Sequence, residues 1–263
     1  MSAPVGTDRV EVVAYNSAVN GFVESFSLVA AKNFESQTVP GTLNGGSTVV
    51  LGVADETGPE PITYSNVPSG YGSPTTLATY AFANYGGIFL ADAATSEYPA
   101  LTADVMESGG YYTYTASSYA TNNSGGEVYA TTTSASGGPM SFTFPPAWSY
   151  AGPVAAAWPS FDLSYPGFSG KTGNCDEVIM GWSTSSDAEY YVQATVTGNY
   201  LNGATTVAVP NLSGLTGFLA APASGTDVVW AANISQGNYL CLQPLPSDGM
   251  LAGVSNAGVY TVP

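Results

Sequence analysis

The stretch Ala188–Thr197, which reads AEYYVQATVT, shows the pattern that decides the fold class. One set of alternate positions is apolar and contains Tyr190, Val192, Ala194 and Val196. The other set is mostly polar and contains Glu189, Gln193, Thr195 and Thr197, with Tyr191 among them. Because side chains alternate between the two faces of a β-strand, this stretch predicts a strand with one buried face and one solvated face.

The same period of two recurs along the chain in segments rich in Val, Thr and Tyr, residue types that favour strands. We predict further strands at 10–15, 22–31, 47–54, 87–92, 99–106, 110–119, 126–133 and 228–234. Turns are predicted at the pairs Asn20-Gly21, Asn44-Gly45, Asn202-Gly203 and Asp248-Gly249, which tolerate the positive φ of tight turns. Strands at this spacing, without alternating helices, indicate an all-β protein of two antiparallel β-sandwich lobes, Ig-like or jelly-roll-like, with little helix.

The division into lobes follows from length and from the position of loop-forming residues. The best helix candidate is 91–97, which Pro99 would limit to one or two turns. The chain of 263 residues is longer than one common sandwich, so we expect two. The Ser- and Gly-rich stretch Thr133–Pro139 marks the expected boundary, with an N-terminal lobe at 1–138 and a C-terminal lobe at 139–263. The proline-rich segment 145–153 is predicted to be a sheet edge or a crossing between lobes.

The charge of the chain excludes several classes of function. Three Lys and Arg residues against 19 Asp and Glu residues give a net charge of −16. So few bases cannot form the positive surface that nucleic acid requires. The absence of His excludes Ser-His-Asp and Cys-His catalysis and imidazole metal ligands. No apolar run approaches the ~20 residues of a membrane-spanning helix, so no transmembrane segment is expected.

The surface is polar through hydroxyl and amide groups more than through charges, which is typical of secreted and envelope proteins. We therefore expect an extracellular or cell-envelope location. Met1–Pro4 has neither the basic nor the apolar region of a secretion leader. The two alternatives are a leader that has been removed and a protein that is kept without one, such as a virion component.

Two cysteines, Cys175 and Cys241, lie in the C-terminal half. In an extracellular protein they predict one disulfide, which would stabilise the fold by roughly 2–4 kcal/mol. Two buried free thiols are the alternative. A metal site is not expected, because two thiolates without His or further Cys do not complete a tetrahedral ligand set.

The C-terminal half also contains a series of aromatic motifs rich in Pro and Gly. They are FTFPPAWSY at 142–150, YPGFSG at 165–170, Trp182, VPNLSGLTGF at 209–218 and GTDVVW at 225–230. In this texture the chain resembles uncharacterised bacterial secreted or lipoprotein-type envelope proteins built of β-sandwich domains. The resemblance implies an envelope or extracellular setting and brings no catalytic motif. The lipid-attachment cysteine of such proteins is missing at the front of this chain.

Carboxylates are the abundant ionisable groups. Asp55, Glu56 and Glu60 lie on a loop with Gly and Pro, and Ca²⁺ prefers such oxygen ligands, so this loop is the candidate site for a structural Ca²⁺. Asn174–Glu177 is a second candidate of the same kind, and in both places a solvated acidic loop is the alternative. A carboxylate-based glycoside hydrolase would need two carboxyl groups across a cleft. Asp187 and Glu189 share a strand face, but a solvated strand end explains them as well.

Aromatic residues form the third group of candidates. Tyr111, Tyr112 and Tyr114 are candidate ligand-binding residues, because exposed tyrosine rings stack on sugars or pack against another subunit. Tyr112 and Tyr114 share a face opposite Tyr111, so one of the two sets is expected in the core. A second cluster consists of Trp148, Tyr150 and Trp158, for which packing within the lobe is the alternative.

The near absence of Lys leaves the edge strands without their commonest protection against pairing with other chains. We therefore expect a non-enzymatic structural protein of the extracellular space or a particle surface, which assembles with itself or with other surface proteins. A carbohydrate-binding module that uses exposed Tyr or Trp is the first alternative. A carboxylate-based glycoside hydrolase is the second.

Overall fold

The computed structural model describes residues 9–20, 23–35, 57–83, 86–103, 105–106, 108–122, 125–168, 174–183, 189–211, 213–216, 220–237 and 250–263. Within these ranges the chain forms fifteen strands and one four-residue helix, α1 (Gly198–Leu201). Every strand pair with a defined register is antiparallel. The predicted all-β, antiparallel class with little helix is therefore confirmed. No helix in the described ranges is long and apolar enough to cross a bilayer.

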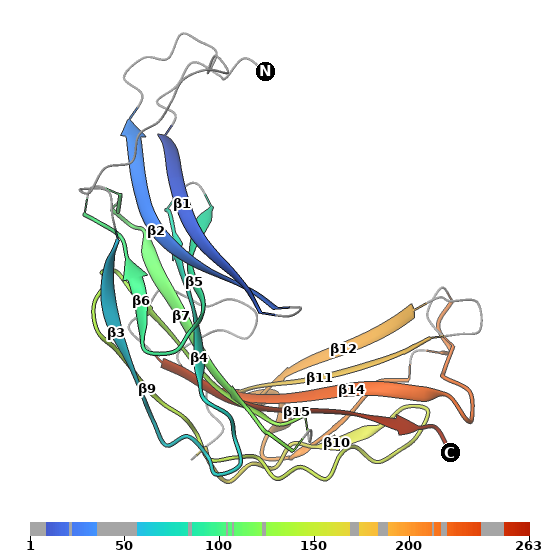
Figure 1. Cartoon of the computed structure of the whole chain (residues 1–263). Coiled ribbons are helices and arrows are strands. Elements are labelled where there is room, and N and C mark those ends of the chain that lie inside the picture. Colours follow the sequence, from blue (N-terminus) through green and yellow to red (C-terminus); the bar gives the residue numbers. More distant parts are fainter. Residues whose placement is uncertain are drawn as a thin grey trace. The chain divides into compact units, whose positions relative to one another are not determined.

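Figure 1 shows the strands in chain order. They are β1 (Arg9–Asn20), β2 (Val23–Glu35), β3 (Gly58–Ser65), β4 (Thr75–Ala81), β5 (Gly87–Ala94), β6 (Glu97–Ala100), β7 (Tyr111–Tyr119), β8 (Glu127–Ser134), β9 (Met140–Thr143), β10 (Ser160–Asp162), β11 (Asn174–Ser183), β12 (Glu189–Thr197), β13 (Thr206–Ala208), β14 (Asp227–Gln236) and β15 (Met250–Thr261). Ten of them hydrogen-bond in the order β1-β2-β5-β4-β7-β8-β15-β14-β11-β12. The order β6-β3-β9 forms a three-stranded sheet, and β10 pairs with β13.

The chain divides into two compact units. Unit 1 comprises 1–63, 75–115 and 133–141, and unit 2 comprises 64–74, 116–132 and 142–263. Both β7 and β8 therefore contribute residues to each unit. The boundary expected at 138/139 falls inside the last segment of unit 1. The sequence does not predict the other points at which the chain passes from one unit to the other. Those within β7 and β8 lie in the middle of a strand, where no loop-rich stretch marks them.

Four tyrosines are the largest fully buried side chains in the core of unit 1. The strict alternation of β7 buries Tyr112 and Tyr114 on one face, where they meet Tyr80 of β4 and Tyr98 of β6. The Tyr80 and Tyr112 rings pack edge to face with centroids 4.9 Å apart, and so do those of Tyr98 and Tyr114 at 5.0 Å. Edge-to-face packing of this kind stabilises a core beyond the burial of apolar area alone.

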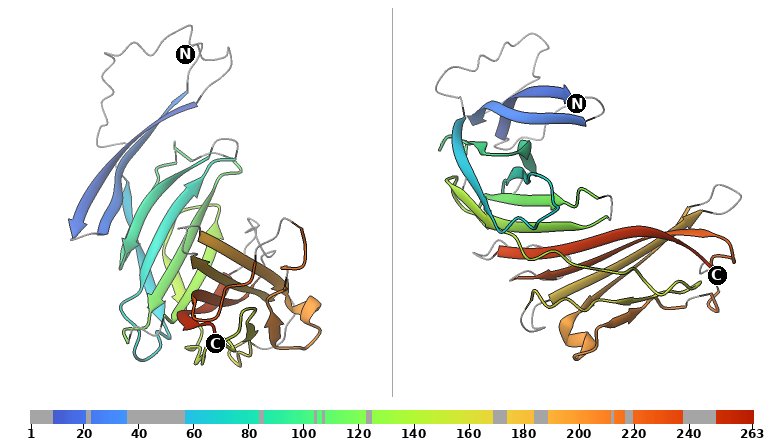
Figure 2. Two further views of the ribbon diagram at one scale, coloured as in Figure 1. Left: turned by 90° about the vertical axis from the view of Figure 1, so that its right-hand side faces the viewer. Right: turned by 60° about the horizontal axis from the view of Figure 1, so that its bottom comes forward.

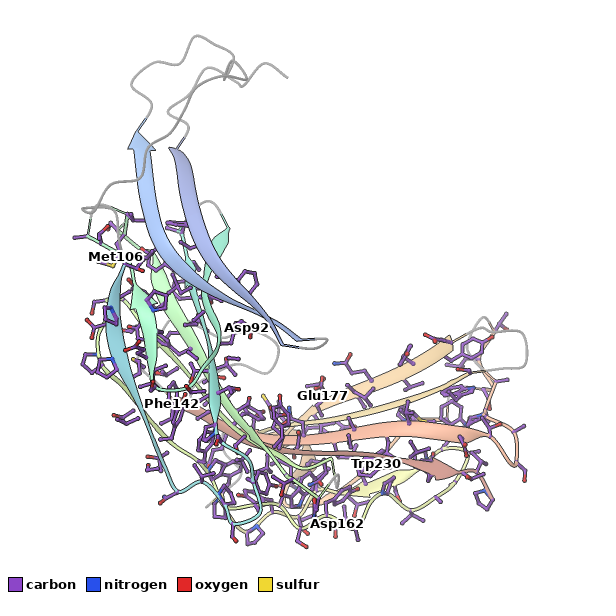
Figure 3. The ribbon with its side chains drawn as sticks, viewed as in Figure 1. Asp92, Met106, Phe142, Asp162, Glu177 and Trp230 are labelled. Atoms are coloured by element: carbon purple, nitrogen blue, oxygen red, sulfur yellow. The ribbon has the colours of Figure 1, made fainter. Side chains whose placement is uncertain are left out.

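In unit 2 the buried face of β14 contains Val228, Ala232 and Ile234. The segment that follows β9, with β10 near its end, packs on this face, where Phe161 and Tyr150 contact the ring of Trp230 at centroid distances of 6.2 and 5.4 Å. Figure 2 shows further views of the β14 and β15 strands. In Figure 3, Trp230 marks this inner face and Glu177 marks the opposite, outer face.

The predicted strands coincide with β1, β2, β5, β7, β8, β12 and β14. The helix predicted at 91–97 is wrong, because β5 extends to Ala94 and β6 begins at Glu97. The strand predicted at 99–106 overlaps only the end of β6. At the predicted turn, Asn202 and Gly203 have φ of 46° and 89°. The strand at 47–54 and the turns Asn44-Gly45 and Asp248-Gly249 lie outside the described residues.

Candidate binding surface on the outer sheet face

A row of residues crosses four neighbouring strands of unit 2. Tyr191 of β12 pairs with Gly181 of β11, and Gly181 pairs with Val229 of β14. Val229 in turn pairs with Val259 of β15. Directly paired residues lie on the same face of a sheet, so these four residues form one continuous row. The row lies on the outer face.

This row is apolar and exposed. The exposed fraction is 64 % for Tyr191, 50 % for Val229 and 61 % for Val259. Of the chain neighbours of this row on the inner face, Met180 and Val228 are fully buried. A contiguous apolar surface that remains in contact with water marks an interaction site more often than a structural one.

Gly181 fixes how Tyr191 lies on the sheet. A Cβ atom at Gly181 would come within 2.8 Å of two ring carbons of Tyr191, so the ring lies over the glycine. The same arrangement of an aromatic ring over a paired glycine occurs for Trp230 over Gly258 and for Tyr129 over Gly253. An aromatic ring over a strand glycine fills the missing side chain and holds the ring close to the backbone.

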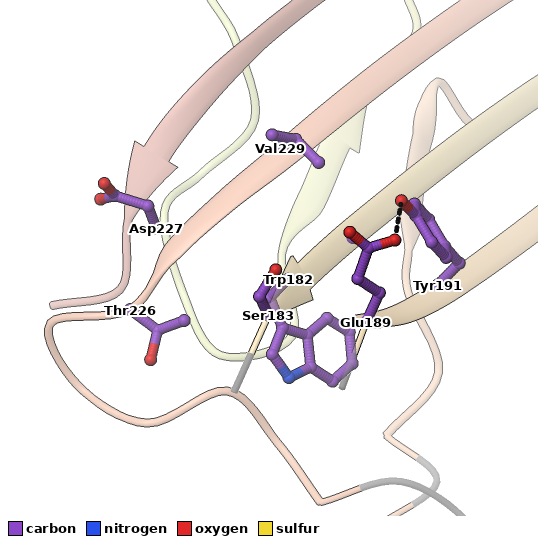
Figure 4. A pocket seen from close by; sticks show the side chains of 8 residues that line it. Trp182, Ser183, Glu189, Tyr191, Thr226, Asp227 and Val229 are labelled. Atoms are coloured by element: carbon purple, nitrogen blue, oxygen red, sulfur yellow. Dashed lines mark hydrogen bonds between the residues drawn. The ribbon is translucent and has the colours of Figure 1, made fainter. Parts of the chain in front are cut away.

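A groove lies along the row and includes Tyr191, Gly181 and Val229 in its lining (Figure 4). Its volume is about 560 Å³, and it is lined by Gly181, Trp182, Ser183, Glu189, Tyr191, Thr226, Asp227 and Val229. The Tyr191 hydroxyl donates to the Glu189 carboxylate at 3.3 Å, and the Thr261 hydroxyl donates to the Asp227 carboxylate at 2.7 Å. The lining contains two carboxylates and no Lys or Arg, so the groove disfavours anionic ligands.

The edge strand β12 adjoins the groove. Its apolar positions face inward but are only half-buried, and they are Tyr190, Val192, Ala194 and Val196. The residues that pair with the first three on β11, namely Trp182, Met180 and Val178, are buried. The apolar inner face of the sheet therefore continues from β11 onto β12, where it is less well covered.

Within the described residues, β12 shows no bulge, Lys or Pro that would prevent an edge strand from pairing. Its register with β11 runs from Cys175↔Thr197 to Ser183↔Glu189 without a bulge. It contains neither Lys nor Pro, and Glu189 is its single charged residue. Among the described residues, β11 is the only strand that pairs with it. Such an edge presents a row of backbone groups to a further strand.

The structure separates the three candidate tyrosines of β7. Tyr112 and Tyr114 are fully buried and therefore offer no ring face to a ligand, whereas Tyr111 is half-buried on the opposite face. The Tyr112 hydroxyl accepts a hydrogen bond from the Leu101 amide at 3.2 Å. Burial raises the pKa of Tyr112 to about 12, although the hydrogen bond from Leu101 lowers it in part.

Tyr98 is the centre of the buried hydroxyl network. Its hydroxyl accepts from the Gly138 amide at 2.9 Å and donates to the Gly138 carbonyl at 3.0 Å. Its single proton is thereby used, so the Tyr114 hydroxyl, 2.8 Å away, must be the donor to Tyr98. Burial raises the pKa of Tyr114, and this donated bond raises it further. The network serves packing in unit 1.

The predicted calcium ligands are only partly described. Glu60 is half-buried in β3, while Asp55 and Glu56 lie outside the described residues. The second candidate, Asn174–Glu177, is not a loop but the start of β11, where Asp176 is buried on the inner face and Glu177 lies on the outer face and accepts a hydrogen bond from Gln193. No group of three His, Cys, Asp or Glu residues in the described part of the chain could hold a metal ion.

Of the two cysteines, Cys175 at the start of β11 is disulfide-bonded, and Cys241 lies outside the described residues. Trp148 and Tyr150 pack against each other with ring centroids 4.5 Å apart, and the Trp148 indole donates to the Ser164 carbonyl. Trp158 contacts Trp182 edge to face at 6.2 Å. The second aromatic cluster is therefore packed within unit 2.

Comparisons with protein-family models, with curated proteins and with solved structures gave no match. The expected kinship with bacterial envelope proteins accordingly stays a prediction.

Proposed function

We propose that this protein is a non-enzymatic structural protein of the extracellular space or a particle surface, built of two β-sandwich lobes, that assembles with copies of itself through β12. The observation that carries the proposal is the unprotected edge of β12, with its half-buried apolar face. A second strand added at this edge would cover these side chains and would satisfy the outward backbone groups.

The sequence of β12 is compatible with antiparallel pairing of two copies about Gln193. In that register Val192 faces Ala194 of the partner subunit, and Tyr190 faces the partner's Val196. Opposed residues lie on the same face, so apolar positions meet apolar positions on the inner side throughout. The pairing has two-fold symmetry and forms a closed dimer, the commonest form of homo-oligomer.

This register also keeps the charges apart. Glu189 faces Thr197 of the partner subunit, so the single carboxylate of β12 meets no like charge. Opposed like charges would weaken a strand pair, and their absence matters in a chain of net charge −16. The neighbouring two-fold registers, centred on Val192 or on Ala194, also match the two faces but pair only three of the four apolar positions with one another, whereas the register centred on Gln193 pairs all four.

Sedimentation velocity of Val192 variants tests the proposal. Val192→Lys and Val192→Asp place a charge of either sign on the covered face, and we expect each to weaken the dimer at least tenfold, which corresponds to about 1.4 kcal/mol. Val154 is exposed to 68 % outside β12, so Val154→Lys and Val154→Asp are the matched controls and should leave the dimer intact.

The sign of the charge separates strand pairing from a general charge effect. If net repulsion alone governed association, Val192→Lys would strengthen the dimer and Val192→Asp would weaken it. A monomeric wild-type chain at all concentrations, or equal effects at Val192 and Val154, would contradict the proposal. Thermal unfolding of each variant shows that the folded state persists.

A further inference from the structure

The outer-face groove has features that strand pairing at β12 does not require. Its volume of about 560 Å³ lies within the range of pockets that hold small ligands. It combines an exposed aromatic ring, that of Tyr191, with two carboxylates and the hydroxyl groups of Ser183 and Thr226. These groups come from β11, from the first residues of β12 and from the start of β14.

The charge of the groove restricts the chemistry of its ligand. Glu189 and Asp227 are both exposed, and no base lines the groove. A phosphate, a sulfate or an anionic glycan would therefore be repelled. A neutral ligand with hydroxyl groups can instead donate hydrogen bonds to both carboxylates, because an ionised carboxylate accepts hydrogen bonds and cannot donate them.

The position of Glu189 relative to Tyr191 distinguishes a neutral ligand from a cation. The carboxylate accepts from the Tyr191 hydroxyl, so it lies at the polar tip of the ring and not over the ring face (Figure 4). An ammonium group held over the ring would lack a carboxylate beside it. A flat ring with C–H groups on its face and hydroxyl groups on its rim matches the arrangement instead.

We propose that the groove binds a neutral carbohydrate, with one pyranose ring stacked on Tyr191 and with sugar hydroxyls donating to Glu189 and Asp227. The ring is prepared for this role, because it lies over Gly181 and its hydroxyl is tied to Glu189. Val229 extends the apolar floor beside the ring. The inference does not rest on assembly through β12, although in the proposed register Tyr191 and Glu189 face Thr195 and Thr197 of the partner subunit.

Binding to neutral saccharides tests this site directly. The full chain is titrated with xylo-, gluco-, manno- and galacto-oligosaccharides and with N-acetylglucosamine oligomers, and binding is followed by NMR and calorimetry. At least one neutral oligosaccharide should bind with a dissociation constant in the millimolar range or tighter. Tyr191→Ala should weaken that binding at least fivefold, the loss expected for one stacking contact. Tyr191→Phe keeps the ring and should therefore retain most of the affinity for the oligosaccharide.

Tyr200→Ala is the matched control, because Tyr200 is an exposed tyrosine of α1 that does not line the groove. It should leave saccharide binding unchanged. Failure of every neutral saccharide to bind, an equal loss in Tyr200→Ala, or preferential binding of spermidine over saccharides would overturn the proposal. The sedimentation of the Val192 variants is unaffected by any of these results, so the two proposals fail separately.

Discussion

The buried hydroxyl network of unit 1 predicts unequal costs for two Tyr→Phe substitutions that remove the same atom. Tyr98→Phe removes a hydroxyl that joins the Gly138 amide, the Gly138 carbonyl and the Tyr114 hydroxyl. Two donors then lose their acceptor in a buried or part-buried setting. An unsatisfied buried donor costs about 1–3 kcal/mol, and the Gly138 amide is only part-buried. We therefore expect Tyr98→Phe to lower the free energy of unfolding by about 2–3 kcal/mol.

Tyr114→Phe should cost less. It removes one donated bond and leaves Tyr98 bound to both backbone groups of Gly138, so a loss of about 1 kcal/mol is expected. In thermal unfolding these losses correspond to decreases of roughly 4–12 °C for Tyr98→Phe and roughly 2–4 °C for Tyr114→Phe. The half-buried Tyr111, on the opposite face of the same strand, supplies the control Tyr111→Phe, for which little change is expected.

The order of the three variants is the informative result. If Tyr114→Phe cost as much as Tyr98→Phe, the assignment of Tyr98 as the centre of the network would be refuted. If both cost as little as Tyr111→Phe, the hydroxyl network of Tyr98, Tyr114 and Gly138 would make no contribution to the stability of unit 1.

Two further predictions concern stability. Burial raises the pKa of Tyr112 and Tyr129 to about 12, above the unfolded value of about 10. Their contribution to the free energy of unfolding is therefore full below pH 10 and is lost as the pH rises through 12. Denaturant unfolding from pH 8 to 12 should show this decline, and a constant free energy of unfolding would contradict it. Gly258→Ala should destabilise by about 1–3 kcal/mol, because the new Cβ would lie 2.9 Å from the Trp230 ring. Gly58→Ala, with no atom within 4 Å of its Cβ, is the control, and an equal loss there would refute the packing argument.

The alternation of Ala188–Thr197 was enough to predict β12 and its two faces, because the period of a strand is a local property. The helix predicted at 91–97 failed because its local composition favours a turn of helix, while pairing of Ala91 and Ala94 with β4 extends β5 through it. The passages of β7 and β8 between the units could not be predicted, since they depend on contacts between distant segments.

The candidate surface was only partly visible in the sequence. Tyr191, a large aromatic among polar residues on the outer face of its strand, was the available signal. Val229 and Val259 join it only through the register of β11, β14 and β15, and Asp227 reaches the groove only through the same pairing. For Tyr112 and Tyr114 the alternation predicted a shared face, and burial of that face decided their role.

Cysteine cross-linking across β12 tests the proposed assembly most directly. In the register centred on Gln193, this residue faces its own copy with Cβ atoms about 4.5–5.5 Å apart, so Gln193→Cys should form a covalent dimer under mild oxidation. Thr195→Cys lies on the same face, but the two copies of that position would be about 13 Å apart and should not cross-link. A disulfide-linked dimer of Gln193→Cys alone, identified by mass spectrometry, is the predicted result. Equal cross-linking of both variants, or of neither, would contradict assembly through β12.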